Sequence, residues 1–172
     1  MSEDRLQEQA LVLPAFKKAP ELRLDMAKIR EAESRIHESK TVNPSTYKEL
    51  EYVFNDAWRD LKRHLSQIGY NITLAEKAIE EAKADVLLDK YPTFMADRPK
   101  SQDNADMRKA FLARDEAYSS ALDWLAQLKA LESVLDSKAK SLEKTCAYMK
   151  KSIELILRSG LSSADLYSTS RK

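Results

Sequence analysis

The sequence predicts an all-α fold: a long antiparallel helical hairpin of the coiled-coil type with an additional N-terminal helix. Two long stretches carry apolar residues at alternating intervals of three and four, which places these residues on one seam of a supercoiled helix. Glycine is nearly absent, with 2 residues in a chain of 172, whereas its usual share is about 7%. Because few glycines permit few tight turns, we expect long helices rather than sheets.

Residues 1–20 are expected to form a mobile N-terminal arm. A short apolar run at Ala10–Leu13 is followed there by Pro14 and Pro20, and proline interrupts regular structure. A first helix is then predicted over residues 21–40, because apolar residues recur there on one helical face. That face consists of Leu22, Met26, Ile29 and Ile36.

The second predicted helix covers residues 44–91. Asn43 is placed to cap it, and Pro44 takes the first helical position, where a missing N–H costs no hydrogen bond. Pro92 is expected to end this helix. The first ladder of apolar residues lies on it and consists of Phe54, Trp58, Leu61, Leu65, Ile68, Ile72, Ala75, Ile79, Ala82 and Val86.

Gly69 offers an alternative end for the second helix. The segment Thr73-Leu74-Ala75-Glu76 has the pattern of a capping box, which would start a new helix after a break at Gly69. Against a break, the ladder keeps its register on both sides of Gly69, and an internal glycine costs only about 1 kcal/mol relative to alanine. We therefore predict one continuous helix.

A loop is predicted over residues 93–103, and a third helix over residues 104–158. Asn104 or Asp103 is expected to cap this helix, and Gly160 to end it before a tail over 161–172. Two long helices joined by a short loop run antiparallel, so residues 21–160 are predicted to form a single helical domain. The second ladder consists of Tyr118, Ala121, Leu125, Leu128, Leu135, Ala139, Leu142, Cys146, Met149, Ile153 and Ile156.

Apolar residues outside the two ladders need burial of their own, which a two-helix hairpin does not supply. Either the helix over 21–40 or a neighbouring subunit must cover them, so a homo-oligomer is expected. These residues are Leu74, Leu87, Leu122, Trp124, Leu131, Leu155 and Leu157.

Composition favours a cytoplasmic protein without a membrane partner. The net charge is +1, so no global field attracts nucleic acid or a membrane surface. No apolar stretch approaches the roughly 18 residues of a membrane span, and the acidic start lacks the pattern of a signal peptide. Cys146 is the only cysteine, which excludes a disulfide within one chain and fits a reducing compartment.

The residue pattern argues against an enzyme and predicts no cofactor and no metal site. His37, His64 and Cys146 lack the paired spacing of metal ligands. With glycines only at positions 69 and 160, no glycine-rich phosphate loop is possible. We expect His64 to be a partly exposed residue beside the seam, and Cys146 to be a small packing residue.

Basic residues with aromatic neighbours are the candidate site. Cations that contact phosphates and rings that stack on bases are what single-stranded nucleic acid requires. The alternative is a polar turn whose aromatic residues only close the end of the hairpin. The first group of candidates comprises Arg98, Lys100, Arg108, Lys109 and Arg114, with the aromatic residues Tyr91, Phe94 and Phe111.

Two further basic groups lie outside the loop. Arg59, Lys62 and Arg63 fall within one turn of the second helix and are the second candidates for nucleic-acid binding. The third group has an alternative interpretation, because cations near a helix C-terminus complement its dipole. It consists of Lys138, Lys140, Lys144, Lys150, Lys151 and Arg158.

The second half of the chain resembles the phage recombination mediators of the UvsY type. The resemblance covers roughly residues 50–157 and rests on the segment 104–118, on Leu88-Asp89-Lys90-Tyr91, and on the heptad helix with Trp124, Cys146 and Met149. It implies a ring-like helical oligomer in the host cytoplasm. Such a protein binds single-stranded DNA and helps load a RecA-like recombinase onto strands occupied by a single-strand binding protein.

One departure from this family concerns the DNA contacts. Family members can carry a Lys-x-Arg pair before the segment that corresponds to Leu88–Tyr91, where this chain has Lys83-Ala84-Asp85-Val86-Leu87. DNA contacts are therefore expected elsewhere or to be weaker. The alternative function is a coiled-coil adaptor, assembly chaperone or inhibitor of a host protein with no DNA role, which the near-zero net charge favours.

Overall fold

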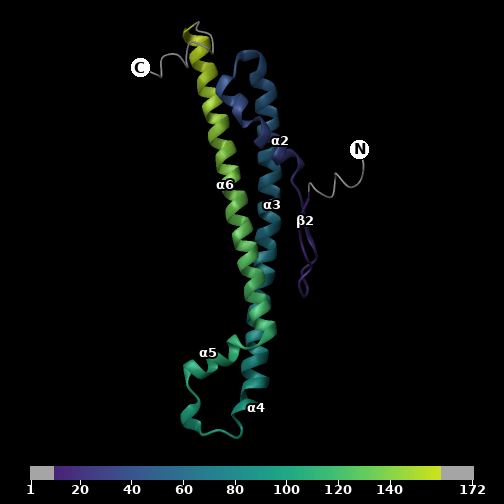
Figure 1. Ribbon diagram of the computed structural model, residues 1–172, viewed down its shortest axis with the longest axis vertical. Helices are drawn as coiled ribbons and strands as arrows, with labels where there is room; N and C mark the ends of the chain where they lie inside the picture. The colour runs from purple at the N-terminus through teal and green to yellow at the C-terminus, as the bar shows by residue number, and fades with distance from the viewer. Residues whose placement is uncertain (1–9, 160–172) are drawn as a thin grey trace. The chain divides into compact units, whose positions relative to one another are not determined.

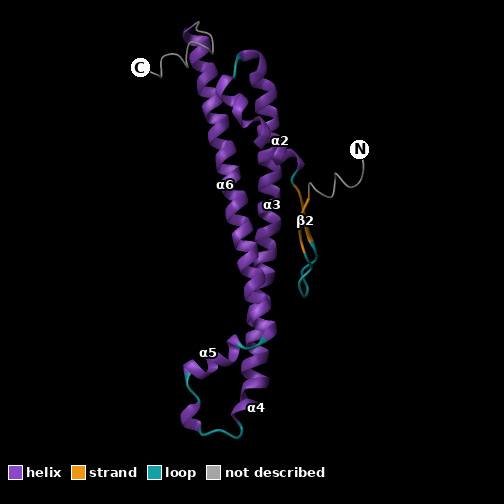
Figure 2. Ribbon diagram, in the orientation of Figure 1, coloured by secondary structure: helices purple, strands orange, loops and turns teal. Residues whose placement is uncertain are grey.

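The computed structural model describes residues 10–159, and the fold is all-α, as predicted (Figure 2). Among the described residues, no helix has the length and apolar character required to cross a membrane. In chain order the elements are β1 (Ala10–Leu13), β2 (Leu22–Asp25), α2 (Ala27–Arg35), the 3-10 helix η1 (Ile36–Thr41), α3 (Pro44–Asp85), the π-helical turn η2 (Val86–Lys90), α4 (Tyr91–Met95), the 3-10 turn η3 (Lys100–Gln102), α5 (Ala105–Ala113) and α6 (Glu116–Ser159).

The chain divides into two compact units, where the sequence predicted a single domain over residues 21–160. The described part of the first unit contains residues 10–13, 23–66 and 134–159, and the second unit contains Pro14–Leu22 and Gln67–Ser133. Each unit therefore combines a part of α3, a part of α6 and a segment from the N-terminal region.

In each unit α3 and α6 lie against each other and run antiparallel, which confirms the predicted hairpin (Figure 1). In the first unit the indole Nε1 of Trp58 donates a hydrogen bond of 2.7 Å to Glu143 Oε1. In the second unit Ile79 packs with Ala121, and Lys129 lies 3.5 Å from Glu76. In the second unit the last part of α3 thus lies against the first part of α6. In the first unit the first part of α3 lies against the last part of α6.

The second ladder is buried as predicted. Its main positions on α6 are fully or almost fully enclosed, and Tyr118, Leu125 and Cys146 are half-buried at its border. Burying such a row removes the apolar surface of several large side chains from water and is the main stabilising term of the fold. The buried members are Ala121, Leu128, Leu135, Ala139, Leu142, Met149, Ile153 and Ile156.

The first ladder is only partly correct. Phe54, Leu61, Ile68, Ala75 and Ala82 are buried, and so are the companions Ile79 and Val86, but the companions Trp58, Leu65 and Ile72 are only half-buried. A further buried row lies one residue before the companion positions, on the side of α3 that the N-terminal segment covers. This row consists of Ala57, His64, Asn71 and Ala78.

His64 is therefore a buried residue, and the prediction of a partly exposed histidine was wrong. Its side chain is 5% exposed, and Nε2 lies 2.7 Å from the carbonyl oxygen of Asp25, at the end of β2. A buried histidine needs such a partner, because an unpaired polar group away from water costs free energy. The contact fastens the N-terminal region of the first unit to α3.

The N-terminal region forms a β-hairpin where the sequence predicted an arm and the start of a helix. β1 pairs with β2, and Phe16 and Ala19 form an antiparallel bridge near the turn. In β2, Leu22 and Leu24 are buried while their neighbours are exposed, which is the alternation of a half-buried strand. The predicted helix over 21–40 begins only at Ala27 and ends at Arg35, followed by η1. Residues 1–9 of the predicted arm lie outside the described residues.

The start of α3 and its continuity through Gly69 are confirmed. Asn43 Oδ1 accepts hydrogen bonds from the backbone N–H of Ser45 at 2.9 Å and of Thr46 at 3.1 Å, and Pro44 is the first helical residue. Gly69 lies inside α3, and a Cβ atom added there would meet nothing within 4 Å. The buried residues around Gly69 keep the helix intact.

Pro92 does not end the second helix. The helical path continues through η2 into α4 and reaches Met95. A proline ring collides with the carbonyl group four residues earlier in an α-helix. The π-helical turn before Pro92, in which the N–H of Tyr91 bonds to the carbonyl of Val86, widens the backbone at this point. The predicted loop therefore begins later, after Met95.

The predicted helix over 104–158 is interrupted. Asn104 caps α5 as predicted, with Oδ1 accepting from the N–H of Met107 at 2.9 Å, but α5 ends at Ala113 and α6 begins at Glu116. Asp115 caps α6, because its Oδ1 accepts from the N–H of Tyr118 at 3.0 Å, and it also forms an ion pair with Lys90. Gly160 and the predicted tail over 161–172 lie outside the described residues.

The burial difference along α6 generates a test of the seam. Leu142→Ala should lower the free energy of unfolding by about 2–5 kcal/mol, because Leu142 is 2% exposed and its loss leaves a cavity. Leu155→Ala is the matched control on the same helix, since Leu155 is 46% exposed, and should change stability by less than about 0.5 kcal/mol. Urea unfolding followed by circular dichroism measures both. Equal losses would contradict this seam.

Candidate nucleic-acid interface

Three aromatic residues of the second unit form a cluster between α4 and α5. Phe111 of α5 lies with its ring centroid 4.7 Å from that of Phe94 and 5.5 Å from that of Tyr91. Tyr91 and Phe94, both in α4, have centroids 6.2 Å apart. These separations are typical of packed aromatic pairs. The structure therefore brings these three aromatic residues together, as the sequence predicted.

Asp103 organises the polar side of the cluster. The hydroxyl of Tyr91 donates to Asp103 Oδ1 at 2.9 Å. Arg108 donates from Nε to Oδ1 at 2.8 Å and from Nη2 to Oδ2 at 2.9 Å, which is a bidentate pair. The Arg108 guanidinium also lies 5.9 Å from the centroid of the Tyr91 ring. One carboxylate thus binds both candidates.

The pKa values of these groups shift in the directions that the contacts require. The bidentate Arg108 guanidinium, followed by the Tyr91 hydroxyl, holds the pKa of Asp103 below its ordinary value of 3.8. Desolvation raises the pKa of Tyr91 above 10.0, and the hydrogen bond to Asp103 adds to this shift. Arg108 keeps its charge, since Asp103 raises its pKa further. The pair is therefore ionised across the physiological range.

Two of the predicted site residues are consequently occupied within the chain. Tyr91 is 5% exposed, so its ring is not available for a base to stack on. Arg108 is exposed, but its fork of donors is already filled by Asp103. Both residues hold the segment between α4 and α5 in place, which is the alternative role that the sequence left open for the aromatic residues.

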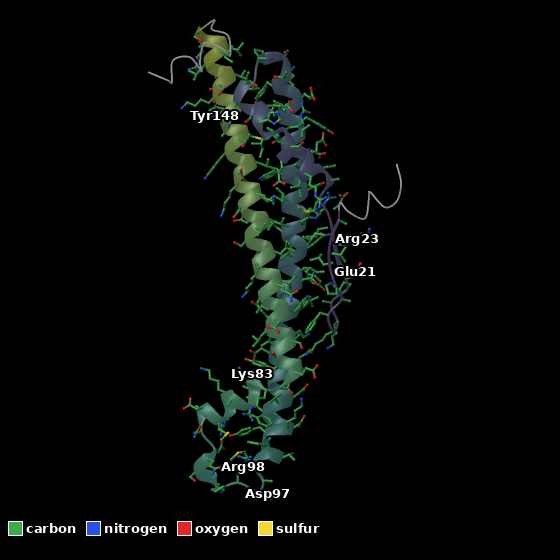
Figure 3. The ribbon with its side chains drawn as sticks, in the orientation of Figure 1. Glu21, Arg23, Lys83, Asp97, Arg98 and Tyr148 are labelled. Carbon is green, nitrogen blue, oxygen red and sulfur yellow. The ribbon has the colours of Figure 1, made fainter. Side chains whose placement is uncertain are left out.

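The remaining cations of this region are exposed. The Arg98 guanidinium lies 4.0 Å from the centroid of the half-buried Phe94 ring, a cation–π contact that leaves its charge at the surface. Figure 3 places Arg98 in the turn after α4. Lys100, Lys109 and Arg114 are exposed, and within residues 10–159 no carboxylate lies in ion-pair distance of them. We call Arg98, Lys100, Lys109 and Arg114 the turn cations.

The second group of candidates lies on α3 in the first unit. Lys62 lies 3.7 Å from Glu143 and 5.4 Å from the centroid of the Trp58 ring, and Arg63 forms an ion pair with Asp60. Arg59 is exposed and has no ion-pair partner in the described part of the chain. Because intramolecular contacts occupy Lys62 and Arg63, this group is a weaker candidate for phosphate binding than the turn cations.

The third basic group, on α6, is divided in the same way. Lys138 forms an ion pair with Glu33, and Lys140 lies 2.6 Å from Asp136. The cations nearer the helix end are exposed and have no ion-pair partner among residues 10–159. They are Lys144, Lys150, Lys151 and Arg158.

Within the described part of the chain no group of three or more His, Cys, Asp or Glu residues could hold a metal ion. His37 Nδ1 lies 2.9 Å from the carbonyl oxygen of Ser34, within its own helical segment. Cys146 is half-buried, and burial raises the pKa of its thiol above 9.0, which disfavours the reactive thiolate.

The sequence did not reveal the role of Asp103. The sequence predicts Asp103 only as a helix cap, whereas the residue binds both Tyr91 and Arg108. The available signal was the presence of an acid five residues before Arg108 in a basic loop. That signal is weak, because the contact depends on how α5 folds back toward α4.

No family model, no curated protein and no solved structure matches this chain.

The Asp103–Arg108 pair generates a prediction about pH. Because the pKa of folded Asp103 is lowered, the stability it contributes is present above pH of about 4 and is lost as the pH falls through the lowered value. Arg108→Gln should return this pKa toward 3.8, as measured by carboxyl ¹³C NMR titration. Arg114→Gln is the control and should leave it unchanged. An unaltered Asp103 pKa in Arg108→Gln would show that the pair does not cause the shift.

Proposed function

We propose that this protein is a non-enzymatic single-stranded-DNA-binding protein and that the turn cations form its phosphate-binding surface. One observation carries the proposal: Arg98, Lys100, Lys109 and Arg114 are exposed in the segment that joins α4 to the end of α5, and Asp103 pairs with Arg108 and with none of these four. Cations without intramolecular partners release counterions when they bind phosphates, which is the main source of affinity for nucleic acid.

Stacking contributes less to this proposal than the sequence suggested. Tyr91 is enclosed, so the rings available to bases are the half-buried Phe94 and Phe111. Arg98, which lies over Phe94, offers a guanidinium plane that also stacks on bases. We therefore expect binding that is dominated by phosphate contacts, with strong salt dependence and little sequence preference.

Because the chain resembles the UvsY-type mediators, we extend the proposal from DNA binding to a role in recombination. In that role the protein would act in the host cytoplasm and help load a RecA-like recombinase onto strands that a single-strand binding protein occupies. A homo-oligomer is part of the same proposal. It is supported by apolar side chains that remain exposed on α6, among them Leu122, Val134 and Leu157.

Binding of a fluorescent single-stranded oligonucleotide, followed by anisotropy at several salt concentrations, tests this function. The double variant Lys100→Gln/Lys109→Gln should bind more weakly, and its slope of log K against log salt should fall by about 1.4, at roughly 0.7 per phosphate contact. Lys77→Gln is the matched control, an exposed α3 lysine outside the turn. An absence of binding by the folded wild-type protein at about 50 mM salt would remove the proposal.

Asp103→Asn provides a test in the opposite direction. The substitution removes the carboxylate that occupies Arg108, so the released guanidinium becomes available to a phosphate. We expect tighter binding and a slope that rises by about 0.7. The same anisotropy titration measures it, with Asp106→Asn as a control for the loss of one negative charge. A gain of equal size in both variants would point to net charge alone.

The second candidate function is a helical adaptor that binds another protein and has no DNA role. The observation that favours it is the exposure of Leu155 and Leu157, at 46% and 69%, beside the cations of the α6 end. Exposed apolar groups of this kind mark interaction surfaces. Native mass spectrometry with and without a short oligonucleotide separates the two functions, because an adaptor keeps its mass when DNA is added.

A further inference from the structure

A pocket of the second unit lies between the helical path of η2 and α4 and the side chains of Asp103 and Arg108. It has a volume of ≈ 310 Å³ and is partly open to solvent. Ligand pockets in proteins range from about 300 to 1,000 Å³, so this one suits a small group. The lining residues are Leu87, Tyr91, Pro92, Met95, Asp103 and Arg108.

The walls that η2 and α4 contribute are apolar and accessible. Leu87, Tyr91 and Met95 follow one another at intervals of four residues, which places them on one face of the helical path. Pro92 is exposed, and Leu87 and Met95 are half-buried, whereas the Tyr91 ring is enclosed. A flat apolar surface that lies on the three accessible side chains removes them from water, which favours the contact.

The polar side of the pocket carries no net charge. Asp103 and Arg108 neutralise each other in their bidentate pair, which uses Nε and Nη2 of the guanidinium. Nη1 of Arg108 takes no part in this pair, and Oδ2 of Asp103 accepts only one of its bonds, so both donor and acceptor capacity remain. An anion gains little from a cation that is already paired, whereas a neutral group with donors and acceptors on its edge does not depend on net charge.

We propose that this pocket receives one unpaired base of a bound strand. The inference rests on the proposed binding of single-stranded DNA and deepens it. The base lies flat against Leu87, Pro92 and Met95, and its polar edge meets the pair of Asp103 and Arg108. In a duplex that edge is used in base pairing and the base is stacked, so only a single strand supplies such a base. We call this cavity the base pocket.

The base pocket adjoins one of the turn cations. A neighbouring pocket shares Asp103 and Arg108 with it and is also lined by Asn104, Ala105, Lys109 and Leu112. Lys109 is exposed there and is free to contact a phosphate of the strand whose base is bound. Phosphate contacts alone fix the position of a strand without reading its bases. The base pocket therefore adds a preference for single strands that the turn cations do not supply.

An abasic oligonucleotide tests the base pocket separately from the phosphate contacts, because it keeps the phosphates and lacks the bases. In anisotropy titrations the full chain should bind an abasic strand of about 12 nucleotides roughly fivefold more weakly than a normal strand, the lower end for one base contact. The slope of log K against log salt should be the same for both strands. Met95→Ala should reduce this preference to about twofold. Met107→Ala is the matched control, a half-buried methionine of α5 outside the lining, and should retain the preference.

Methionine methyl signals give a second measurement on the unmodified chain. With ¹³C in the methyl groups of its 5 methionines, a base that lies on Met95 should shift the signal of this residue through the ring current, and Met95→Ala identifies that signal. The abasic strand lacks the ring and should leave the signal in place.

The outcomes separate the base pocket from the proposed function. Equal binding of the normal and abasic strands with an unmoved Met95 signal would overturn the base pocket and leave the phosphate surface standing. A preference that Met95→Ala and Met107→Ala lower equally would also overturn it. If neither strand binds at about 50 mM salt, the proposed function itself fails, and the base pocket with it.

Discussion

The fold depends on burying α3 on two adjacent sides. One side meets α6 through the row that contains Phe54, Leu61 and Ile68, and the other meets the N-terminal segment through the row that contains His64. In the first unit Lys28 of α2 adds an ion pair of 2.8 Å to Asp56, and in the second unit Phe16 packs against the Ala78 cluster. A two-helix hairpin alone would leave the second side open to water. The N-terminal segment therefore belongs to the core, although it is short.

Heptad spacing predicted the α6 seam well, because large apolar side chains mark most of its buried positions and Ala121 and Ala139 keep the same register. It failed on the second side of α3, where the buried row contains two alanines, a histidine and an asparagine. Small residues at these positions let another segment approach closely, and a buried histidine is acceptable when a carbonyl group such as that of Asp25 lies beside it. Neither feature has an apolar period that sequence alone could show.

The other prediction errors arose where the local sequence had only a weak preference for one secondary structure. At these places contacts with residues distant in the sequence determined the structure. The segment Leu22–Asp25 fits both a helical stripe and strand alternation, and pairing with β1 selects the strand. Residues around Asp115 are good helix formers, so nothing local signalled a break. The break is stabilised because Asp115 binds Lys90 and caps α6, and these contacts, that with Lys90 above all, hold the pKa of Asp115 below 3.8. Pro92 was a reliable signal of disruption, but a π-helical turn absorbs it without ending the helix.

Contacts between residues distant in the sequence also decide the candidate site. Composition predicted that basic and aromatic residues would meet between the two long helices, and they do, but it could not predict which charges the protein would neutralise itself. Asp103 pairs with Arg108 and binds the hydroxyl of Tyr91, and Glu143 and Asp60 pair with Lys62 and Arg63. What remains are single exposed cations without an ion-pair partner in the described part of the chain, among them the turn cations. Single cations of this kind attract anions through their field, whereas the rings of the aromatic cluster pack α4 against α5.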